Sequence, residues 1–428
     1  MVNKNIAVVG LWHLGCIYST SLAKMGFKVV GFDVNKKIVN NLNKGIPPIF
    51  EPELEEILNK HLNKNLKFSI LGKDLKNKDY IFITHDVEID DNDTVQLSTV
   101  NKLLQIVTKN ASEDTVIVIS SQLPVGTGRN LMNSMKKNGI LNPKVIYFPE
   151  NLRLGQAYSS FLRPDRIILG SDNVLILERF KKDFDFNSKV ITMGLESAEM
   201  VKHALNSYLA LCISFSSELS DLSEKTRANM IDVVKALKSD KRVSPFAPLA
   251  PGLGFSGGTL GRDVQSLRKI GKNLGQTTKL LDAIYDVNSD RLPMLVKKIN
   301  TKLPTLKGKT IGILGLTYKA NTNTLRRSTS LELSKLLKKK GCNIKAYDPV
   351  IKNEIEDFSF IKVCSSYNDF FKNLDMVVLM TEWPEFKEIE PKTVAPLMKS
   401  AIVVDTKNFL NESEYKGSGF TYIGIGMQ

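Results

Sequence analysis

The stretch NIAVVGLWHLG at residues 5–15 decides the fold of the first part of this chain. Its apolar run reads as a buried strand, and Gly10 then ends that run. A helical pattern follows through SLAKMG at residues 21–26, and FKVVGFD at residues 27–33 reads as a second strand that ends in Asp33. The order of strand, glycine turn, helix and strand is typical of the first unit of a doubly wound parallel sheet.

The rest of the chain continues this alternation, interrupts it and then repeats it. Short β-branched runs at residues 79–84, 114–120 and 144–150 extend the first sheet. Residues 196–225 contain no glycine or proline, and their apolar residues recur every three or four positions, which predicts one long helix. After a linker at residues 304–308, four more strand-like runs follow, at residues 309–316, 343–349, 375–381 and 401–406.

The sequence therefore predicts an α/β protein with two Rossmann-like, doubly wound parallel-sheet domains joined by a long helical spine. We place a first sheet domain at residues 1–190, a helical spine at 191–304 and a second sheet domain at 305–428.

The composition excludes several classes of protein. The chain has 428 residues, of which 42% are hydrophobic and 24% charged, as in a globular protein with more than one core. No window approaches the 18 apolar residues of a membrane helix, and the first ten residues do not form a signal peptide, so we expect a cytoplasmic protein away from membranes. The net charge of +14 is lysine spread along the chain, without the arginine and aromatic stripe of a nucleic-acid groove. The four cysteines and four histidines lack metal-ligand spacing, so no metal site is expected.

The first glycine turn has most features of a dinucleotide fingerprint. Gly10 permits the tight turn and Gly15 lets helix and strand approach, while the pyrophosphate would lie at the helix N-terminus. Asp33, 23 residues after Gly10, can accept both ribose hydroxyls and repel a 2′-phosphate, which favours NAD over NADP. Trp12 replaces the middle glycine, so its indole must point away or the cofactor must be held differently. An ordinary βαβ turn is the alternative; as a cofactor site it would use Gly10, Trp12, His13, Leu14, Gly15 and Asp33.

Two further patterns carry polar side chains. GILGLTYKANTNTLRRS at residues 312–328 is a second strand and glycine turn with Lys319, Arg326 and Arg327 at its mouth, which suits a phosphate-bearing ligand or is simply a basic helix start. Lys202 and Asn206 are four residues apart on the predicted long helix, so they share one face. Together they can polarise an oxygen, although exposed residues at this spacing are often only solvated.

The order of these motifs resembles the UDP-glucose and GDP-mannose 6-dehydrogenase family over nearly the whole chain. The matching stretches are LNKGIPPIFEPELEEIL, PENLRLG, RPDRIILG, AEMVKHALNSYL, GLGFSGGTLGRDV, GLTYKANTNTLRRS, AYDP, MTEWPEF and VVDTKN. The resemblance implies an NAD domain and a nucleotide-sugar domain flanking a spine through which two subunits pair as a homodimer. It also implies two successive oxidations of the C6 alcohol of the sugar, in a setting of capsule or other polysaccharide biosynthesis. In the second oxidation a cysteine captures the aldehyde and passes through a thioester.

This sequence departs from the family at the residues of the second oxidation. The cysteine falls at Thr259, the glutamate associated with hydrolysis becomes Leu154, and a water-positioning threonine becomes Gln122. Lys202, Asn206 and Asp263 match the residues that polarise the alcohol oxygen and take up its proton. We therefore expect oxidation of the alcohol to stop at or near the aldehyde. Full oxidation through the aldehyde hydrate, or nucleotide-sugar binding without turnover, are the alternatives.

The resemblance also assigns binding residues. Glu150, retained from the family's catalytic set, should lie along the sugar and its phosphates with Leu152 and Arg153, while Phe255 and Gly257 lie beneath the sugar. Lys319 matches a substrate contact and Arg242 an arginine lent to the neighbouring subunit. Arg326 matches a residue that reaches the cofactor, and Lys407 replaces an arginine whose planar guanidinium it cannot reproduce.

Overall fold

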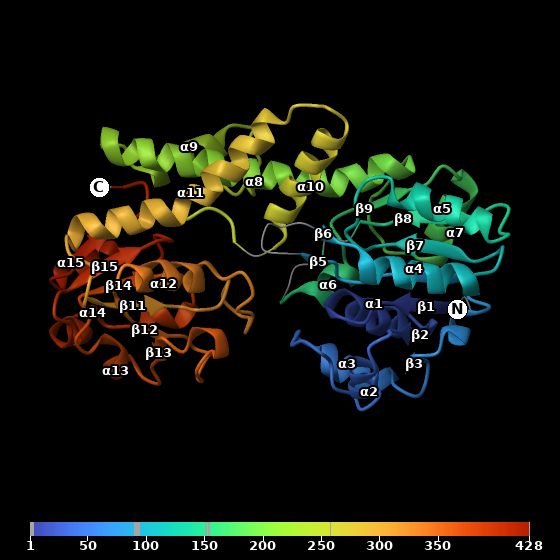
Figure 1. Ribbon diagram of the computed structural model, residues 1–428, viewed down its shortest axis with the longest axis horizontal. Helices are drawn as coiled ribbons and strands as arrows, with labels where there is room; N and C mark the ends of the chain where they lie inside the picture. Colours follow the sequence, from blue (N-terminus) through green and yellow to red (C-terminus); the bar gives the residue numbers. More distant parts are fainter. Residues whose placement is uncertain (1–3, 90–94, 150–151, 153–154, 257, 428) are drawn as a thin grey trace. The chain divides into compact units, whose positions relative to one another are not determined.

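The computed structural model describes residues 4–89, 95–149, 152, 155–256 and 258–427. The chain divides into two compact units, Met1–Leu205 and Asn206–Gln428. Each unit contains its own parallel sheet, drawn in blue to green and in orange to red in Figure 1. The prediction of two doubly wound sheets is confirmed; the three-part division at residues 190 and 304 stays a prediction.

The first unit holds an eight-stranded sheet in the order β10-β9-β8-β7-β4-β1-β2-β3. The strands are β1 (Asn5–Val9), β2 (Lys28–Phe32), β3 (Leu66–Ser69), β4 (Tyr80–Ile83), β7 (Val116–Ile119), β8 (Lys144–Tyr147), β9 (Ile167–Gly170) and β10 (Val190–Met193). The helices are α1 (His13–Lys24), α2 (Lys36–Leu42), α3 (Leu54–His61), α4 (Ser98–Asn110), α5 (Thr127–Lys137), α6 (Ala157–Leu162) and α7 (Val174–Asp183). A small hairpin, β5 (Glu88–Ile89) and β6 (Val95–Gln96), lies outside this sheet.

The second unit holds a six-stranded sheet in the order β13-β12-β11-β14-β15-β16. Its strands are β11 (Thr310–Leu314), β12 (Asn343–Tyr347), β13 (Ile361–Val363), β14 (Met376–Leu379), β15 (Ile402–Asp405) and β16 (Thr421–Ile423). Before the sheet come α9 (Met230–Ser239), α10 (Leu260–Asn273) and α11 (Lys279–Lys302); within it come α12 (Thr329–Lys339), α13 (Tyr367–Phe371), α14 (Pro391–Val394) and α15 (Glu412–Gly417).

Both sheets are buried on their two faces, which explains the nearly continuous apolar runs of their strands. In β1, Ile6 and Val8 join one apolar core while Ala7 and Val9 join the core on the opposite face. The strands β4, β7 and β9 are buried at every position. Because side chains alternate across a strand, helices must cover both sides of such a sheet.

One long helix, α8 (Leu195–Thr226), agrees within one residue at each end with the predicted helix at 196–225. It is continuous across the boundary between the two units, and Figure 1 shows it as the long green helix.

The first sheet departs from a fully parallel arrangement at β9, which pairs with β8 in the antiparallel sense through Tyr147 and Gly170. The only helix described between the two strands is α6, which has six residues. A parallel connection usually carries a helix along one face of the sheet, and the six residues of α6 make fewer than two helical turns, so the described part of this connection lacks such a helix.

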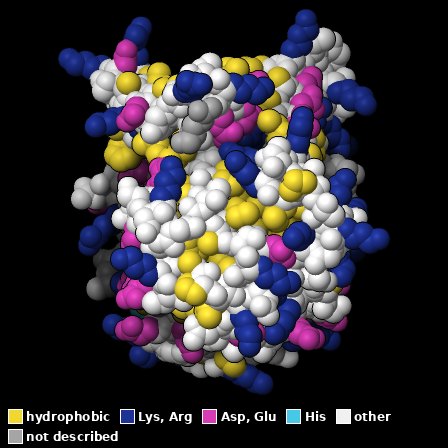
Figure 2. Space-filling model, turned by 90° about the vertical axis from the view of Figure 1, so that its left-hand side faces the viewer, with side chains coloured by type: hydrophobic (Ala, Val, Ile, Leu, Met, Phe, Trp, Pro, Cys, Tyr) yellow, Lys and Arg dark blue, Asp and Glu magenta, His cyan; other side chains and the backbone are white. Residues whose placement is uncertain are grey.

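The surface carries the excess of positive charge in dispersed form. On the face shown in Figure 2, lysine and arginine side chains are scattered among acidic and neutral ones and form no single band. No helix in the described part of the chain is long and apolar enough to cross a membrane.

Candidate active site

The first glycine turn lies where the sequence predicts a dinucleotide site. Gly10 follows β1 with a φ of 95°, and a Cβ there would lie 2.5 Å from the Cα of His85. Gly15, in α1, packs so closely that a Cβ would lie 1.8 Å from the Gly10 carbonyl oxygen. Only glycine fits these two positions. The N–H groups in the first turn of α1 have no partner within the helix and are suited to bind an anionic ligand at its N-terminus.

Asp33 stabilises this turn from the end of β2. Its Oδ2 accepts a hydrogen bond from the Leu11 N–H at 2.7 Å, and its Oδ1 accepts one from the Asn35 N–H at 2.8 Å. The residue is 6% exposed, and each carboxylate oxygen keeps a further lone pair for a ribose hydroxyl. Trp12, at 43% exposure, has its indole outside the core. The cradle of Gly10, Gly15 and Asp33 therefore fits a dinucleotide, with Leu14 buried behind it.

A buried carboxylate that the sequence did not single out for a role connects this turn to another segment. Glu51, in the loop before α3, has a side chain without solvent exposure. Its Oε1 is 2.9 Å from His13 Nε2 and accepts the Gly155 N–H at 2.6 Å. Burial raises the pKa of Glu51, but the hydrogen bonds from His13 and from backbone N–H groups outweigh burial, so the net pKa lies below its ordinary value. Glu51 is thus held as an anion.

The start of α8 contacts the loop that follows β7, where Gln122 is 7% exposed. Glu199 is fully buried and accepts the N–H groups of Gly126 at 2.6 Å and Gly128 at 2.8 Å, at the N-terminus of α5. Burial raises the pKa of Glu199 despite these two bonds. One turn later, His203 Nε2 lies 3.0 Å from the Leu123 carbonyl oxygen. These contacts fix α8 against the loop that carries Gln122.

The polar pair predicted on α8 is buried. Lys202 and Asn206 are each 6% exposed, so they are not the solvated surface residues of the alternative interpretation. Asn206 Nδ2 donates a short hydrogen bond to Asp263 Oδ2, and Asp263 is completely buried in the first turn of α10. The structure therefore brings Asn206 and Asp263 together, 57 residues apart in sequence. Their shared geometry can hold an oxygen atom and receive its proton.

The glycine-rich loop before α10 is held by another residue that sequence reasoning missed. Asn288, on α11, accepts the Phe255 N–H at 2.8 Å and donates to the Phe255 carbonyl at 3.2 Å. Gly254, with a φ of 76°, would place a Cβ 2.3 Å from Asn288 Oδ1. Phe255 itself is 9% exposed and packs with Ala210. The Asn288 amide satisfies both the N–H and the carbonyl group of Phe255, as a neighbouring β-strand would, and so holds the loop in place.

Thr259 follows this loop at the N-cap of α10 and is exposed. Its side chain makes no capping hydrogen bond in the described part of this helix. The hydroxyl at the position of the family's cysteine thus has no described structural task.

The second sheet repeats the first turn with one difference. Gly315 has a φ of 90° and would place a Cβ 2.5 Å from Thr381 Cβ, and Asp348 Oδ2 accepts the Leu316 N–H at 2.7 Å. However, α12 begins only at Thr329, so the predicted helix start is a loop at residues 316–328. Positive φ angles at Asn321 and Arg327 break a helix there.

The basic residues of this loop, and the remaining residues predicted to contact the ligands or the neighbouring subunit, are exposed or partly buried. Lys319 Nζ is 5.8 Å from the Tyr318 ring centroid, and Arg326 is exposed. Arg242, with a side chain 88% exposed, pairs with Asp240 at 2.7 Å. Lys407 Nζ lies 3.4 Å from Glu382, and Leu152 packs against the core of the first unit. Four predicted positions, Glu150, Arg153, Leu154 and Gly257, lie outside the described residues.

Comparison with known proteins agrees with this layout. Three sequence profiles of the UDP-glucose/GDP-mannose dehydrogenase family match in order: the NAD binding domain at residues 4–183, the central domain at 196–290 and the UDP binding domain at 312–412. A UDP-glucose 6-dehydrogenase of Rickettsia bellii is 33% identical over 99% of this chain and 99% of its own length.

A second relative and a solved structure give the same result. The UDP-glucose 6-dehydrogenase of Rickettsia conorii is 34% identical, with 99% of both chains covered. The structure of a UDP-glucose dehydrogenase from Pyrobaculum islandicum superposes with a TM-score of 0.90 at 26% identity, covering 100% of this chain and 98% of that one. The chain therefore belongs to the UDP-glucose/GDP-mannose dehydrogenase family and is an NAD-dependent dehydrogenase of nucleotide sugars.

Proposed function

We propose that this enzyme oxidises the C6 alcohol of a nucleoside-diphosphate hexose, similar to UDP-glucose, to the aldehyde and releases it at that stage. The observation that carries the proposal is a contrast within one segment. Asp263 is buried and bound to Asn206, as alcohol oxidation requires, whereas the thiol position four residues earlier holds the exposed hydroxyl of Thr259.

The retained residues are sufficient for the first oxidation. Lys202 and Asn206 would hold the C6 oxygen and stabilise negative charge on it, and Asp263 would take up its proton through a water molecule. Bound NAD⁺ would supply the acceptor for the hydride that leaves C6. One alcohol and one NAD thus give one aldehyde, one NADH and one proton.

The second oxidation lacks its nucleophile. A threonine hydroxyl has no accessible anion near neutral pH, so it cannot replace the thiolate that forms a thiohemiacetal. The cysteines of the chain do not offer a substitute, since Cys16, Cys212, Cys342 and Cys364 are all buried. Burial also raises the pKa of Cys364 to about 11. A thioester pathway therefore has no thiol to use.

The experiment is an anaerobic incubation with NAD and UDP-, GDP-, CDP- and dTDP-sugars, in which NADH per sugar consumed is counted and the product mass is measured. We expect one NADH and a product that hydroxylamine traps. The matched variants are Thr259→Ser, which should behave as wild type, and Thr259→Cys, which should gain measurable second turnover. Two NADH and a carboxylate from the wild type would support full oxidation through the hydrate, and tight binding without NADH would support a non-catalytic binding protein.

We further propose that the enzyme is a homodimer paired through the helical spine. On α8, Tyr208, Phe215 and Leu222 are 56%, 46% and 56% exposed and recur every seven residues, so they line one face of the helix. Such an apolar stripe is expected where a second helix packs. Phe215→Asp should shift the mass measured by light scattering from dimer to monomer, whereas Leu141→Asp, another exposed apolar position, should not.

The remaining assignments follow the family setting. We propose the division into residues 1–190, 191–304 and 305–428, a cytoplasmic location and a role in capsule or other polysaccharide biosynthesis. The roles given above to Glu150, Leu152, Arg153, Arg242, Phe255, Gly257, Lys319 and Arg326 belong to the same proposal.

A further inference from the structure

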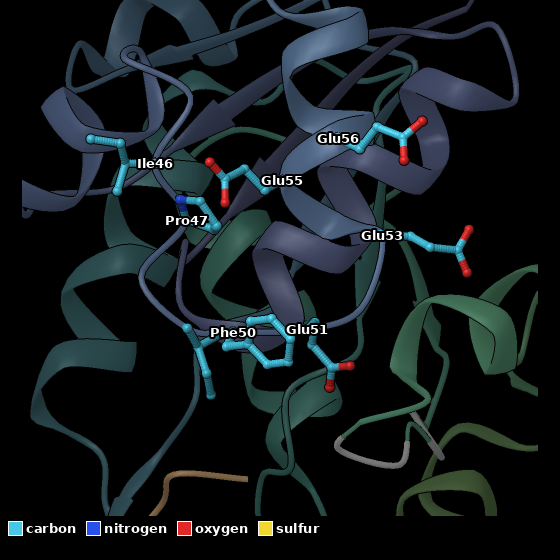
Figure 3. Close-up of a pocket in the computed structure, with 8 residues that line it drawn as sticks. Ile46, Pro47, Phe50, Glu51, Glu53, Glu55 and Glu56 are labelled. Carbon is cyan, nitrogen blue, oxygen red and sulfur yellow. The ribbon is translucent and has the colours of Figure 1, made fainter. Parts of the chain in front are cut away.

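The environment of Glu51 indicates a role beyond packing. The loop before α3 forms a cavity of ≈ 360 Å³, and Figure 3 shows Glu51 turned away from Glu53, Glu55 and Glu56, the other labelled acidic residues. Those three side chains belong to exposed residues, whereas the Glu51 side chain has no exposure. Burying an anion lowers the stability of the folded protein unless hydrogen bonds compensate for its lost hydration. The residues that hydrogen-bond to Glu51 therefore indicate its role.

The contacts of Glu51 join two segments far apart in sequence. His13 is the first residue of α1, directly after Trp12 in the dinucleotide turn. Gly155 directly follows the stretch PENLRL, which the proposed function assigns to the sugar. A single oxygen, Oε1, bonds to both, at 2.9 Å and 2.6 Å. These sequence separations of 38 and 104 residues mean that no local structure holds the three residues together.

We propose that Glu51 is a positioning residue that couples the dinucleotide turn to Gly155, two residues before α6. When a dinucleotide orders the start of α1, His13 is fixed, Glu51 is fixed through it, and Gly155 is held in turn. The residue touches neither reactant. It sets the distance between the cofactor side and the sugar side of the site, and only the naming of the second ligand as a nucleotide sugar rests on the proposed function.

The chemistry of the link defines which substitutions break it. Glutamine in place of Glu51 keeps a carbonyl oxygen that can accept both bonds, because the two donors are N–H groups. Alanine removes both bonds and leaves the part-buried Gly155 N–H without its Glu51 acceptor, which costs free energy. His13→Ala removes only the cofactor arm. Glu56→Ala, at an exposed position of α3, is the matched control.

The test measures coupling without turnover. Hydrogen exchange of the peptide that contains Gly155 is followed in the free protein and with saturating NAD⁺, and NAD⁺ affinity is measured by quenching of tryptophan fluorescence. The chain has two tryptophans: Trp12 in the turn is 43% exposed, and Trp383 is 3% exposed. We expect NAD⁺ to slow exchange at Gly155 in the wild type and in Glu56→Ala.

The variants decide the proposal. Glu51→Ala and His13→Ala should both lose the NAD⁺-dependent protection, and Glu51→Ala should bind NAD⁺ roughly tenfold more weakly. Glu51→Gln should restore most of both. A lower melting temperature in Glu51→Ala with unchanged NAD⁺-dependent protection would mean a purely structural role and overturn the proposal, as would Glu51→Gln behaving like Glu51→Ala. If Glu51→Ala does not fold, His13→Ala decides by the same readout. Because the readout needs no sugar, a wild type that binds NAD⁺ but turns over no sugar would refute the proposed function and leave this test valid.

Discussion

The two sheet domains build the same turn and finish it in different ways. In both, the three strands at one side run in the order third, second, first, and a glycine with positive φ follows the first strand. In both, an aspartate directly after the second strand accepts a hydrogen bond from the N–H of the residue that follows the turn glycine. The distance is 2.7 Å from Leu11 to Asp33 and 2.7 Å from Leu316 to Asp348. The first turn leads at once into α1, while the second leads into the loop at residues 316–328.

If both turns bind a phosphate-bearing ligand as proposed, we expect them to do so by different groups. The first turn, with Leu11, Trp12 and His13, has no lysine or arginine and offers the N–H groups and dipole of α1. The second has no helix at that place but carries Lys319, Arg326 and Arg327. Backbone N–H groups give a fixed geometry, whereas long cationic side chains adapt to the ligand and respond to salt.

Replacing the turn glycines should have the largest effect. Gly10→Ala and Gly315→Ala each force a side chain into a positive φ and into contact with a neighbour at 2.5 Å. Each should lower the free energy of unfolding by about 2–4 kcal/mol. Gly10→Ala should abolish NAD⁺ binding, and Gly315→Ala should abolish UDP binding, as measured by calorimetry alongside urea unfolding. Gly26→Ala, with the same φ of 95° but open space around it, separates backbone strain from the clash. Retention of NAD⁺ binding by Gly10→Ala would refute the assignment of the first turn.

Neutralising the two aspartates should have the next largest effect and should separate their roles. Asp33→Asn should weaken NAD⁺ binding by about tenfold or more and narrow the preference over NADP⁺, because a 2′-phosphate is no longer repelled. Asp348→Asn should cost about 1–3 kcal/mol of stability and leave NAD⁺ affinity unchanged. The dissociation constants of both dinucleotides provide the measurement. An unchanged ratio of the two constants in Asp33→Asn would show that Asp33 supports the turn only.

Removing one cation from the second turn should have a moderate effect. Lys319→Met should weaken binding of UDP-glucose by about fivefold and reduce the salt dependence of that binding, because one charge contact is lost. NAD⁺ binding at the first turn, which has no lysine or arginine, should change little with salt in the same titrations. Lys392→Met, at an exposed position on α14, is the control. Equal salt dependence for the two ligands would remove the distinction between the turns.

Restoring the usual glycine should have the smallest effect. Trp12 has a φ of −90°, which does not require glycine, and its indole is largely outside the core. Trp12→Gly should therefore change the NAD⁺ dissociation constant by less than about fivefold and cost about 0.5–1 kcal/mol through backbone entropy. Fluorescence cannot report on this variant, so calorimetry is the measurement. A change of a hundredfold would mean that the indole itself contacts the cofactor.

The sequence predicted those features whose cause is local. The helix at 196–225 could be predicted because a long amphipathic run without glycine or proline has few other conformations. Both glycine turns could be found because in each case an apolar strand-like run ends in a glycine that precedes a more polar segment. The burial of Lys202 and Asn206 could not be predicted, since the spacing alone fits a solvated face equally well.

What the sequence missed depends on distant partners. Glu51 reads as a polar loop residue until the fold brings His13 and Gly155 to it, and Asn288 reads as a helix surface residue until Phe255 lies beside it. The roles of Glu199 and His203 became clear only from their hydrogen bonds to the loop after β7. Single polar residues carry no periodicity, so pattern analysis has no signal with which to find their partners.

The exposed hydroxyl of Thr259 has an evolutionary consequence. Since this side chain caps no described part of α10, and Asn288 and Asp263 are held by other contacts, the residue at 259 can change without disturbing the surrounding structure. A lineage can therefore exchange thiol and hydroxyl here at little cost to folding. Under the proposed function, position 259 is one of three positions, with 122 and 154, at which substitutions can alter the number of oxidations while both glycine turns and their aspartates stay unchanged.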